Sequence, residues 1–553
     1  MNPRGKYKPL PRFRFRNRKW PTRTIRHAPM WCSVDLRDGN QALMDSMTVE
    51  QKLELFDTLV ACGLKEIEVG FPAAAAVEYE FIRRLIDEQR IPGDVTIQVL
   101  TQAREEQIKK TIESLVGARR VIIHLYNSTS PVQRRVVFGL KEPEIVAIAV
   151  QGAEWAKAYA ERLLAGTEVV YEYSPESFSA TETDFALRVC DAVMGVFQPT
   201  PERKMIINLP ATVELAMPHV YADQIEYFCR NMLRRDTAII SVHTHNDRGC
   251  AVAATEFGLL AGADRVEGTL FGNGERTGNC DLVTVALNMF SDGVDPELDF
   301  SNLPAIREVY ERCTSMAVDP RHPYAGSLVF TAFSGGHQDA IAKAFEAREE
   351  GEVWDNPYLG IDPSDIGCTY EPIRINSQSG KGGVAYRLEK DCGIRLPKDM
   401  VREFGLVVAP LIEALGREAL PADLARMFRK EYIERTSPYR LVSFHSSDDT
   451  NGCLIRATVQ RGELVFPVTG VGKGPIDAFV RALREAGVVD VNVVDEAQHS
   501  LGDDESAPAM TYVKLQLCNG RSGQGDPVRW GAGVDTSTTM SALSAILSAL
   551  NRS

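Results

Sequence analysis

The chain has 553 residues, of which 44% are hydrophobic and 25% are charged. These proportions are ordinary for a soluble globular protein and exclude a mainly disordered, collagenous or disulfide-scaffold chain, while the length suggests several domains. The 75 acidic residues outnumber the 62 basic residues and give a formal charge of −13, so we expect no general nucleic-acid binding, which needs clustered Lys and Arg.

The sequence also carries no sign of a membrane or of an oxidising compartment. No run of about 18 apolar residues occurs, so we expect no membrane span. The 11 cysteines include no C-x-x-C pair, which argues against a disulfide framework or a zinc ribbon. We therefore expect a reduced, cytoplasmic setting.

Residues 1–30 form a basic segment with no acidic residue. A transit peptide would also be rich in Arg and poor in acids. This segment, however, lacks Ser and is broken by Pro3, Pro9, Pro11 and Pro21, so it cannot form a good amphipathic helix. We expect an N-terminal arm that clasps a partner subunit, in preference to a targeting signal.

From Trp31 onward, short apolar segments alternate with helix-like segments, the first of which begins after the N-cap candidate Thr48. Eight strands, each followed by a helix, predict a closed (β/α)8 TIM barrel, to which we assign residues 31–315. An open doubly wound sheet is the alternative, but polar residues follow most of the strands instead of one switch point. The predicted strands are 31–36, 65–69, 94–100, 119–125, 167–174, 204–210, 237–245 and 265–270.

Two regions of different character follow the barrel. Residues 316–433 contain Gly- and Pro-rich loops and shorter helices, which indicate linker subdomains. Residues 434–553 return to strands and amphipathic helices and indicate a small α+β domain. Its predicted strands are 441–447, 454–460, 463–470, 488–496 and 509–518, and its helices are 474–488 and 538–551.

In a TIM barrel the active site lies at the carboxyl ends of the strands, so residues there are the candidates for chemistry. His243 and His245 end the seventh strand, and residues i and i+2 of a strand project to one face, where two imidazoles can bind one divalent ion. Asp38, after the first strand, could complete the set, and Arg37 beside it is a cation for a developing oxyanion. The alternatives are a pair of structural histidines and a surface Arg–Asp turn.

Other strand ends carry weaker candidates. The glycine-rich loop after the eighth strand contains Gly278 and Asn279, and Asn279 could face the metal. Such a loop could instead cradle phosphate, but it lacks the Lys-Ser/Thr pair of a nucleotide-hydrolysing P-loop. The remaining candidates are His124, Ser174, Glu176 and Thr212, each of which alone is more often structural than catalytic.

Several long motifs, in order, resemble 2-isopropylmalate synthases of the longer bacterial and fungal branch, over nearly the whole chain from Trp31. The motifs are VDLRDGNQ (34–41), YSPESFSATE (173–182), NLPATVE (208–214), HTHNDRG (243–249), GNGERTGN (272–279), SGGHQDAI (334–341) and NSQSGKGGVAY (376–386).

The resemblance implies a Claisen-type condensation of acetyl-CoA with 2-oxoisovalerate, followed by thioester hydrolysis to 2-isopropylmalate and CoA, the first committed step of leucine synthesis. It implies a divalent ion (Mg, Mn or Zn) held by Asp38, His243 and His245, with Asn279 in its shell; a monovalent cation such as K⁺ is a further candidate. Arg37, positioned by Glu176, would stabilise the developing negative charge. His124 and Thr212 would bind the oxo acid, while Ser174 and the backbone near Gly278 would shape the pocket.

The resemblance also implies roles beyond the barrel. His337 would act as the base or activate water, from the same or a second subunit, the alternative being that it only orders its loop. The domain from 434 would bind leucine as a feedback inhibitor, through glycine-rich loops at 470–475 and 531–533, and the enzyme would be a homodimer. The acidic segment 501–505 departs from the family pattern.

Four other functions remain open from the sequence. Homocitrate and citramalate synthases share the metal and Arg-Asp motifs, and Leu100 is an apolar candidate for the pocket wall that would separate them from the present chain. A metal-dependent amidohydrolase carries its H-x-H after the first strand, whereas here it follows the seventh. A leucine sensor with a dead barrel would have lost the metal ligands, which are present.

Overall fold

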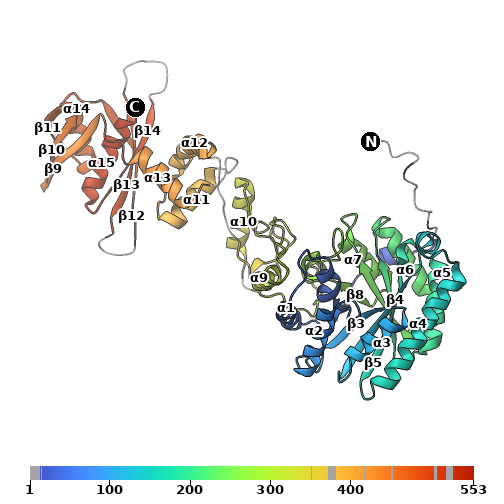
Figure 1. Cartoon of the computed structure of the whole chain (residues 1–553). Helices are drawn as coiled ribbons and strands as arrows, with labels where there is room; N and C mark the ends of the chain where they lie inside the picture. Colours follow the sequence, from blue (N-terminus) through green and yellow to red (C-terminus); the bar gives the residue numbers. More distant parts are fainter. Residues whose placement is uncertain are drawn as a thin grey trace. The chain divides into compact units, whose positions relative to one another are not determined.

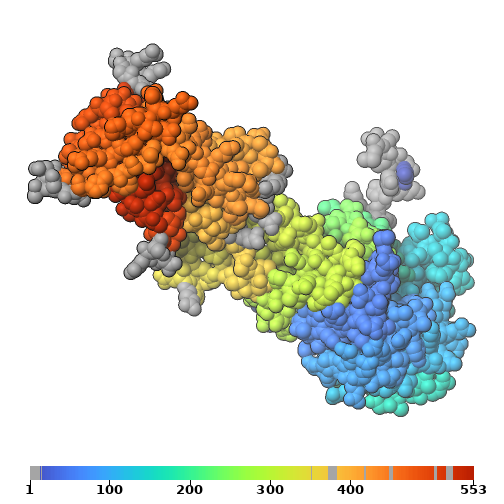
Figure 2. Space-filling model, turned by 60° about the vertical axis from the view of Figure 1, so that its left-hand side comes forward, coloured from blue at the N-terminus to red at the C-terminus, as the bar shows by residue number. Residues whose placement is uncertain are grey.

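The computed structural model divides into two units, each of which is described here by itself (Figures 1 and 2). One unit comprises Met1–Phe330 with Ile361–Thr369, and the other comprises Thr331–Gly360 with Tyr370–Ser553. The described residues are 6, 13, 15–349, 351–370, 381–415, 419–449, 452–502, 507–518 and 527–552.

The first unit is a closed barrel of eight parallel strands in sequential order, so the predicted TIM barrel is confirmed. Strand β1 pairs in parallel with both β2 and β8, which excludes the open sheet. The strands are β1 (Met30–Ser33), β2 (Glu66–Gly70), β3 (Thr96–Gln102), β4 (Arg120–Ser128), β5 (Glu168–Glu176), β6 (Met205–Ala211), β7 (Ala238–Thr244) and β8 (Arg265–Gly268).

Helices surround the barrel and bury their apolar faces against it (Figure 1). Thr48 caps α1 as predicted: its side chain accepts a hydrogen bond from the backbone N–H of Gln51, and the Gln51 side chain accepts one from the backbone N–H of Thr48. The helices are α1 (Val49–Ala61), α2 (Ala76–Asp87), α3 (Glu105–Ser114), α4 (Glu142–Leu163), α5 (Thr183–Phe197), α6 (Pro218–Asn231), α7 (Ala251–Ala261), α8 (Leu282–Ser291) and α9 (Leu303–Thr314).

The first strand ends earlier than the sequence predicts. β1 stops at Ser33, and Asp35–Gly39 forms one turn of π-helix. The backbone N–H groups of Arg37 and Gly39 both donate to the carbonyl oxygen of Val34. The apolar and β-branched residues 31–36 resemble a continuous strand, but this wide turn, a feature often found at functional sites, presents Arg37 and Asp38 at the barrel mouth.

The described part of the N-terminal arm packs on its own barrel. Trp20 is buried and donates from Nε1 to Asp223 at 2.9 Å, and its ring packs at a tilt against Phe257 of α7. Glu226 accepts hydrogen bonds from the backbone N–H of Lys19 at 3.0 Å. Residues 1–5, 7–12 and 14 lie outside the described residues, so a contact of the arm with a partner subunit stays a prediction.

The second unit begins with the helices that follow the barrel. Part of the predicted 376–386 motif, residues 376–380, lies outside the described residues. Among the described residues, no helix is long and apolar enough to cross a membrane. The helices are α10 (Gly335–Ala347), α11 (Lys381–Cys392), α12 (Lys398–Leu415) and α13 (Pro421–Tyr432).

The C-terminal α+β domain consists of two similar halves, each with a three-stranded antiparallel sheet followed by a helix. Apolar side chains of both helices and both sheets share one core. The first half is β9 (Tyr439–Asp449), β10 (Gly452–Arg461), β11 (Leu464–Gly472) and α14 (Pro475–Glu485), and the second is β12 (Val491–Ser500), β13 (Ala509–Leu517), β14 (Val528–Asp535) and α15 (Thr538–Asn551).

Strand β14 was not predicted, and its glycines are not in a loop as expected. A Cβ atom on Gly531 would lie 2.2 Å from the carbonyl oxygen of Ala545, and one on Gly533 would lie 2.1 Å from that of Ser541. Gly470 in β11 meets α14 in the same way. These glycines let a helix pack directly on a strand, a role that a glycine-rich sequence shares with ligand-binding loops. Residues 503–505 of the acidic segment lie outside the described residues.

Candidate active site

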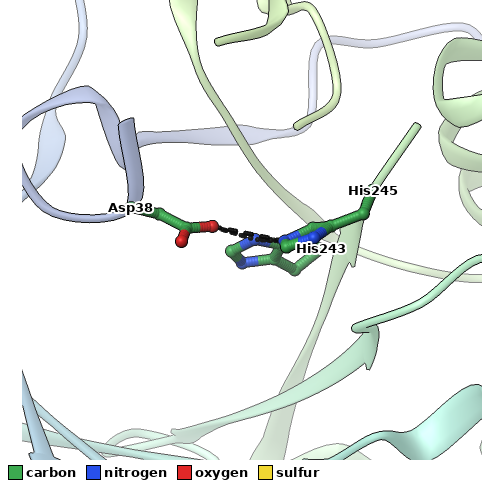
Figure 3. A group of neighbouring side chains, drawn as sticks. All are labelled: Asp38, His243 and His245. Atoms are coloured by element: carbon green, nitrogen blue, oxygen red, sulfur yellow. Dashed lines mark hydrogen bonds and ion pairs between the residues drawn. The ribbon is translucent and has the colours of Figure 1, made fainter. Parts of the chain in front are cut away.

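Three predicted metal ligands converge at the carboxyl ends of β1 and β7 (Figure 3). Oδ2 of Asp38 lies 3.3 Å from Nε2 of His243 and 3.2 Å from Nε2 of His245, and the two Nε2 atoms are 3.2 Å apart. All three side chains are buried. Two imidazoles and one carboxylate that face a common point can bind a divalent ion.

Asn279 joins this group from the loop after β8. Its Oδ1 lies 2.8 Å from Nε2 of His243, and its Nδ2 donates to the carbonyl oxygen of Asn273 at 3.0 Å. Gly278 precedes it with a φ of +99°, and a Cβ atom there would lie 2.0 Å from the carbonyl oxygen of Gly272. The glycine therefore permits the tight loop that aims Asn279 at the histidines.

Two charged side chains contact the outer nitrogens of the histidines. Glu267 lies 2.7 Å from Nδ1 of His243 and can accept its ring proton, which leaves Nε2 free to bind a metal. Arg276 donates to Nδ1 of His245 at 2.7 Å. Because a guanidinium only donates, Nε2 of this neutral ring carries the proton, and metal binding through Nε2 requires Arg276 to move.

The electrostatics of the group favour an exchange of protons for a cation. Burial lowers the pKa of His243, but hydrogen bonds to Asp38 and Glu267 outweigh it and raise that pKa to about 9. Burial lowers the pKa of His245, while burial raises the pKa of Asp38 but Arg37 and the histidines hold it well below its usual range. A metal ion would displace the proton on His243, and the carboxylate of Asp38 would then face the metal instead of the protonated ring.

Arg37 is held by a carboxylate that the sequence analysis did not single out. Its Nε donates to Glu68 of β2, and a second guanidinium nitrogen lies 3.2 Å from Asp38. Glu176, the expected partner of Arg37, instead accepts a hydrogen bond from Ser128. Two acids thus flank Arg37 and fix its direction.

His124 and Ser174 extend the same network across the barrel. Nδ1 of His124 lies 2.7 Å from Glu68, and Nε2 lies 2.7 Å from Oγ of Ser174. Asn208 of β6 also donates to Oγ of Ser174, at 3.0 Å. Thr212 directly follows β6. Its hydroxyl oxygen accepts a hydrogen bond from the backbone N–H of Ser177 at 2.9 Å, which leaves its own hydroxyl proton available.

These side chains line one cavity of about 300 Å³ at the mouth of the barrel. The structure therefore brings together in the cavity wall every predicted site residue of the barrel except Gly278 and Asn279, and Asn279 contacts Nε2 of His243 from the loop after β8. The lining residues are Arg37, Asp38, Gln41, Phe71, Leu100, His124, Tyr126, Ser174, Glu176, Asn208, Pro210, Thr212, His243, His245, Glu275 and Arg276.

A layer of buried charge lies beneath the cavity. Arg265 of β8 donates to Glu267 at 2.8 Å, to Gln98 at 2.7 Å and to Glu66 at 2.5 Å. Burial, together with the neighbouring Glu267, raises the pKa of Glu172 on β5 well above its usual range. In the sequence, this layer could have been recognised from acidic residues inside otherwise apolar strands. The alternation of side chains along a strand places these residues on the face that points into the barrel.

His337 lies in α10 of the second unit, where its ring stacks on Tyr358 with centroids 4.0 Å apart. Its contribution to the barrel site stays a prediction.

Comparisons with known proteins agree with this geometry. Residues 28–309 match the family described as HMGL-like, residues 327–389 match the alpha-isopropylmalate synthase post-catalytic domain, and residues 418–553 match the LeuA allosteric (dimerisation) domain. The 2-isopropylmalate synthase of Parafrankia sp. is 52% identical over 100% of this chain and 97% of its own length. Those of Rhodospirillum rubrum and Clostridium acetobutylicum are each 50% identical, over 100% and 99% of this chain and 99% of each relative. The chain belongs to the 2-isopropylmalate synthase family.

Proposed function

We propose that the chain condenses acetyl-CoA with 2-oxoisovalerate and hydrolyses the thioester to give 2-isopropylmalate and CoA, the first committed step of leucine synthesis. One observation carries this proposal: Asp38, His243 and His245 meet within 3.3 Å beside Arg37, at the mouth of a barrel whose relatives of 50–52% identity bear that enzyme's name. The presence of these three side chains disfavours the alternative of a leucine sensor whose barrel has lost its metal ligands.

The donor set fits a divalent ion (Mg, Mn or Zn), because it combines two imidazoles, one carboxylate and the amide oxygen of Asn279. When bound, such an ion acts as a Lewis acid toward the keto oxygen and carboxylate of an oxo acid. Asp38, His243 and His245 would hold it, and Glu267 would keep the ring of His243 in the binding tautomer.

The side chains around this group have the properties that the condensation needs. Arg37 is a fixed cation, held by Glu68 and Asp38, that can stabilise the negative charge developing on an enolate or alkoxide oxygen. The free hydroxyl proton of Thr212 can be donated to the carboxylate of the oxo acid. His124 and Ser174, hydrogen-bonded to each other, would contact the oxo acid from the opposite wall, and Glu176 would contribute from the end of β5.

The apolar part of the cavity wall supports 2-oxoisovalerate as the substrate. Phe71, Leu100, Tyr126 and Pro210 face the cavity and suit an isopropyl group. A homocitrate synthase would need a cationic partner for a second carboxylate on that wall. Because a few methylenes change the transition-state energy by only about 1 to 3 kcal/mol, slower turnover of related oxo acids is expected.

The regulatory and quaternary proposals depend on the C-terminal domain. Its match to an allosteric dimerisation domain supports feedback inhibition by leucine and a homodimer. The base is proposed to be His337, and a monovalent cation such as K⁺ is proposed as an accessory ion.

The test is the release of CoA, detected with a thiol reagent. The purified chain is mixed with acetyl-CoA and a panel of 2-oxo acids, with and without chelator, leucine and K⁺. We expect fastest release with 2-oxoisovalerate, loss with chelator and a lower rate with leucine. Fastest release with pyruvate or 2-oxoglutarate would identify a citramalate or homocitrate synthase, and no release with any oxo acid would refute the condensation.

A further inference from the structure

The turn that carries Arg37 and Asp38 is anchored by a buried lysine of α1. Nζ of Lys52 donates to the carbonyl oxygen of Leu36 at 2.9 Å. Leu36 directly precedes Arg37 and lies inside the π-helical turn. The side chain of Lys52 is 0% exposed, so this bond is made by a charged group that has been withdrawn entirely from water.

Glu78 of α2 is the counterion of this lysine and a second anchor for the same segment. The Glu78 carboxylate pairs with Lys52, and the same oxygen accepts from Nδ2 of Asn40 at 3.2 Å. Asn40 follows the turn, and its own Oδ1 accepts from the backbone N–H of Met47 at 2.8 Å. The pair therefore contacts the segment at two points: Lys52 bonds to Leu36, immediately before Arg37, and Glu78 bonds to Asn40, immediately after the turn.

The other oxygen of Glu78 reaches the end of β2. It accepts from the backbone N–H of Phe71 at 3.3 Å, and a Cβ atom on Gly70 would lie only 2.3 Å from it. Strand β2 also carries Glu68, the carboxylate that orients Arg37, and Phe71 faces the cavity. One carboxylate thus connects the turn with the strand end that holds its arginine.

Burying a lone ammonium or carboxylate is costly, and a helix-to-helix contact does not need it. Helices α1 and α2, part of the blue surface in Figure 2, are also joined by an exposed pair, Arg84–Glu50, at 3.0 Å. Unlike the exposed pair, the buried pair contacts the backbone of the turn that carries Asp38.

We propose that Lys52 and Glu78 are positioning residues that hold the Asp35–Gly39 turn in the geometry needed for metal binding and for the action of Arg37. The kinetic part of this inference rests on the proposed function, whereas the part concerning metal affinity does not.

The experiment compares the full-length chain with Lys52→Met, which keeps the length of the side chain but removes its donors, and with Glu50→Gln, which removes the exposed pair between the same helices. Metal-free proteins are titrated with Mn²⁺, and free Mn²⁺ is measured by EPR; circular dichroism checks folding. We expect Lys52→Met to raise the Kd for Mn²⁺ by roughly 10- to 100-fold, as for other groups that orient metal ligands. Its kcat at saturating Mn²⁺ should also fall, while Glu50→Gln should match the wild type in both.

A folded Lys52→Met with wild-type Kd overturns the proposal, as does an equal rise in Kd for Glu50→Gln. If Lys52→Met does not fold, Glu78→Gln decides by the same criterion, because it keeps an oxygen toward Lys52 but presents an amide to Phe71; we expect its Kd to rise severalfold. A wild type that binds Mn²⁺ but condenses no oxo acid would end the proposed function alone, since the Kd comparison still decides the role of the pair.

Discussion

Replacing Glu267 with Gln should weaken metal binding without changing a metal ligand. One oxygen of Glu267 faces Nδ1 of His243 at 2.7 Å and Nδ2 of Asn208 at 3.1 Å. The other faces Nε2 of Gln98 at 2.9 Å and a guanidinium nitrogen of Arg265 at 2.8 Å. Asn208, Gln98 and Arg265 present donors, and His243 must also donate from Nδ1 when Nε2 binds a metal.

A Gln amide cannot satisfy this environment in either orientation, because its NH₂ group must face two donors. If NH₂ faces Arg265 and Gln98, buried donors lose their acceptor, at about 1 to 3 kcal/mol each. If it faces His243, the imidazole changes tautomer and its Nε2 carries a proton instead of a lone pair. Loss of such an orienting partner costs roughly 10- to 100-fold in metal affinity, or about 1.4 to 2.7 kcal/mol.

The matched control is Glu66→Gln. Glu66 also pairs with Arg265, at 2.5 Å, but it is the first residue of β2 and lines a different cavity from His243. Titration of the metal-free proteins with Mn²⁺ should give weaker binding for Glu267→Gln and wild-type binding for Glu66→Gln, although both should lower the thermal midpoint. Wild-type affinity in a folded Glu267→Gln would refute the role assigned to this carboxylate.

Three other changes test separate features. Arg37→Lys loses the fork held by Glu68 and Asp38, so kcat should fall by roughly 100-fold with little change in Mn²⁺ affinity; a near-normal kcat would show that a simple cation suffices. His337→Ala should cut turnover strongly and leave metal content unchanged, and near-normal turnover would exclude it as the base. Burial raises the pKa of Asp35 from 3.8 to about 7, so the unfolded chain ionises first and stability falls as pH rises through this range. Relative to Asp35→Asn, the wild type should lose about 2 kcal/mol between pH 5 and pH 7 in urea unfolding; parallel pH profiles would contradict the shift.

The barrel could be predicted from sequence because each strand and helix is specified locally. Alternating apolar runs and caps such as that at Thr48 act within a few residues, and polar residues at strand ends follow from the fold. The end of β1 could not be predicted, because the π-helical turn after it depends on a residue that is distant in sequence. The backbone N–H of Leu270 donates a hydrogen bond to Asp35, the first residue of the turn. Likewise, β14 was missed because its glycines are explained only by the helix that packs on them.

The candidate site could be predicted in its ligands but not in its partners. A histidine pair and an Arg-Asp dipeptide are recognisable in one sequence, whereas the pairing of Arg37 with Glu68 depends on how two strands lie side by side. Glu176 was the partner that the family resemblance implied for Arg37. The structure instead places Glu68 nearer, on the neighbouring strand β2, and Glu176 accepts from Ser128.

The buried charge beneath the cavity is best understood as the support of the site and not of the fold. Arg265 is fully buried among Glu267, Glu66 and Gln98, and well-packed apolar residues of similar volume would often be as stable or more so. The acids of this layer, however, also bind the groups above: Glu267 fixes His243, and Glu68 fixes both Arg37 and His124. An apolar interior would remove the carboxylates of Glu267 and Glu68 that orient these three side chains from below. The barrel therefore keeps a costly interior because the mouth requires charged side chains in fixed directions.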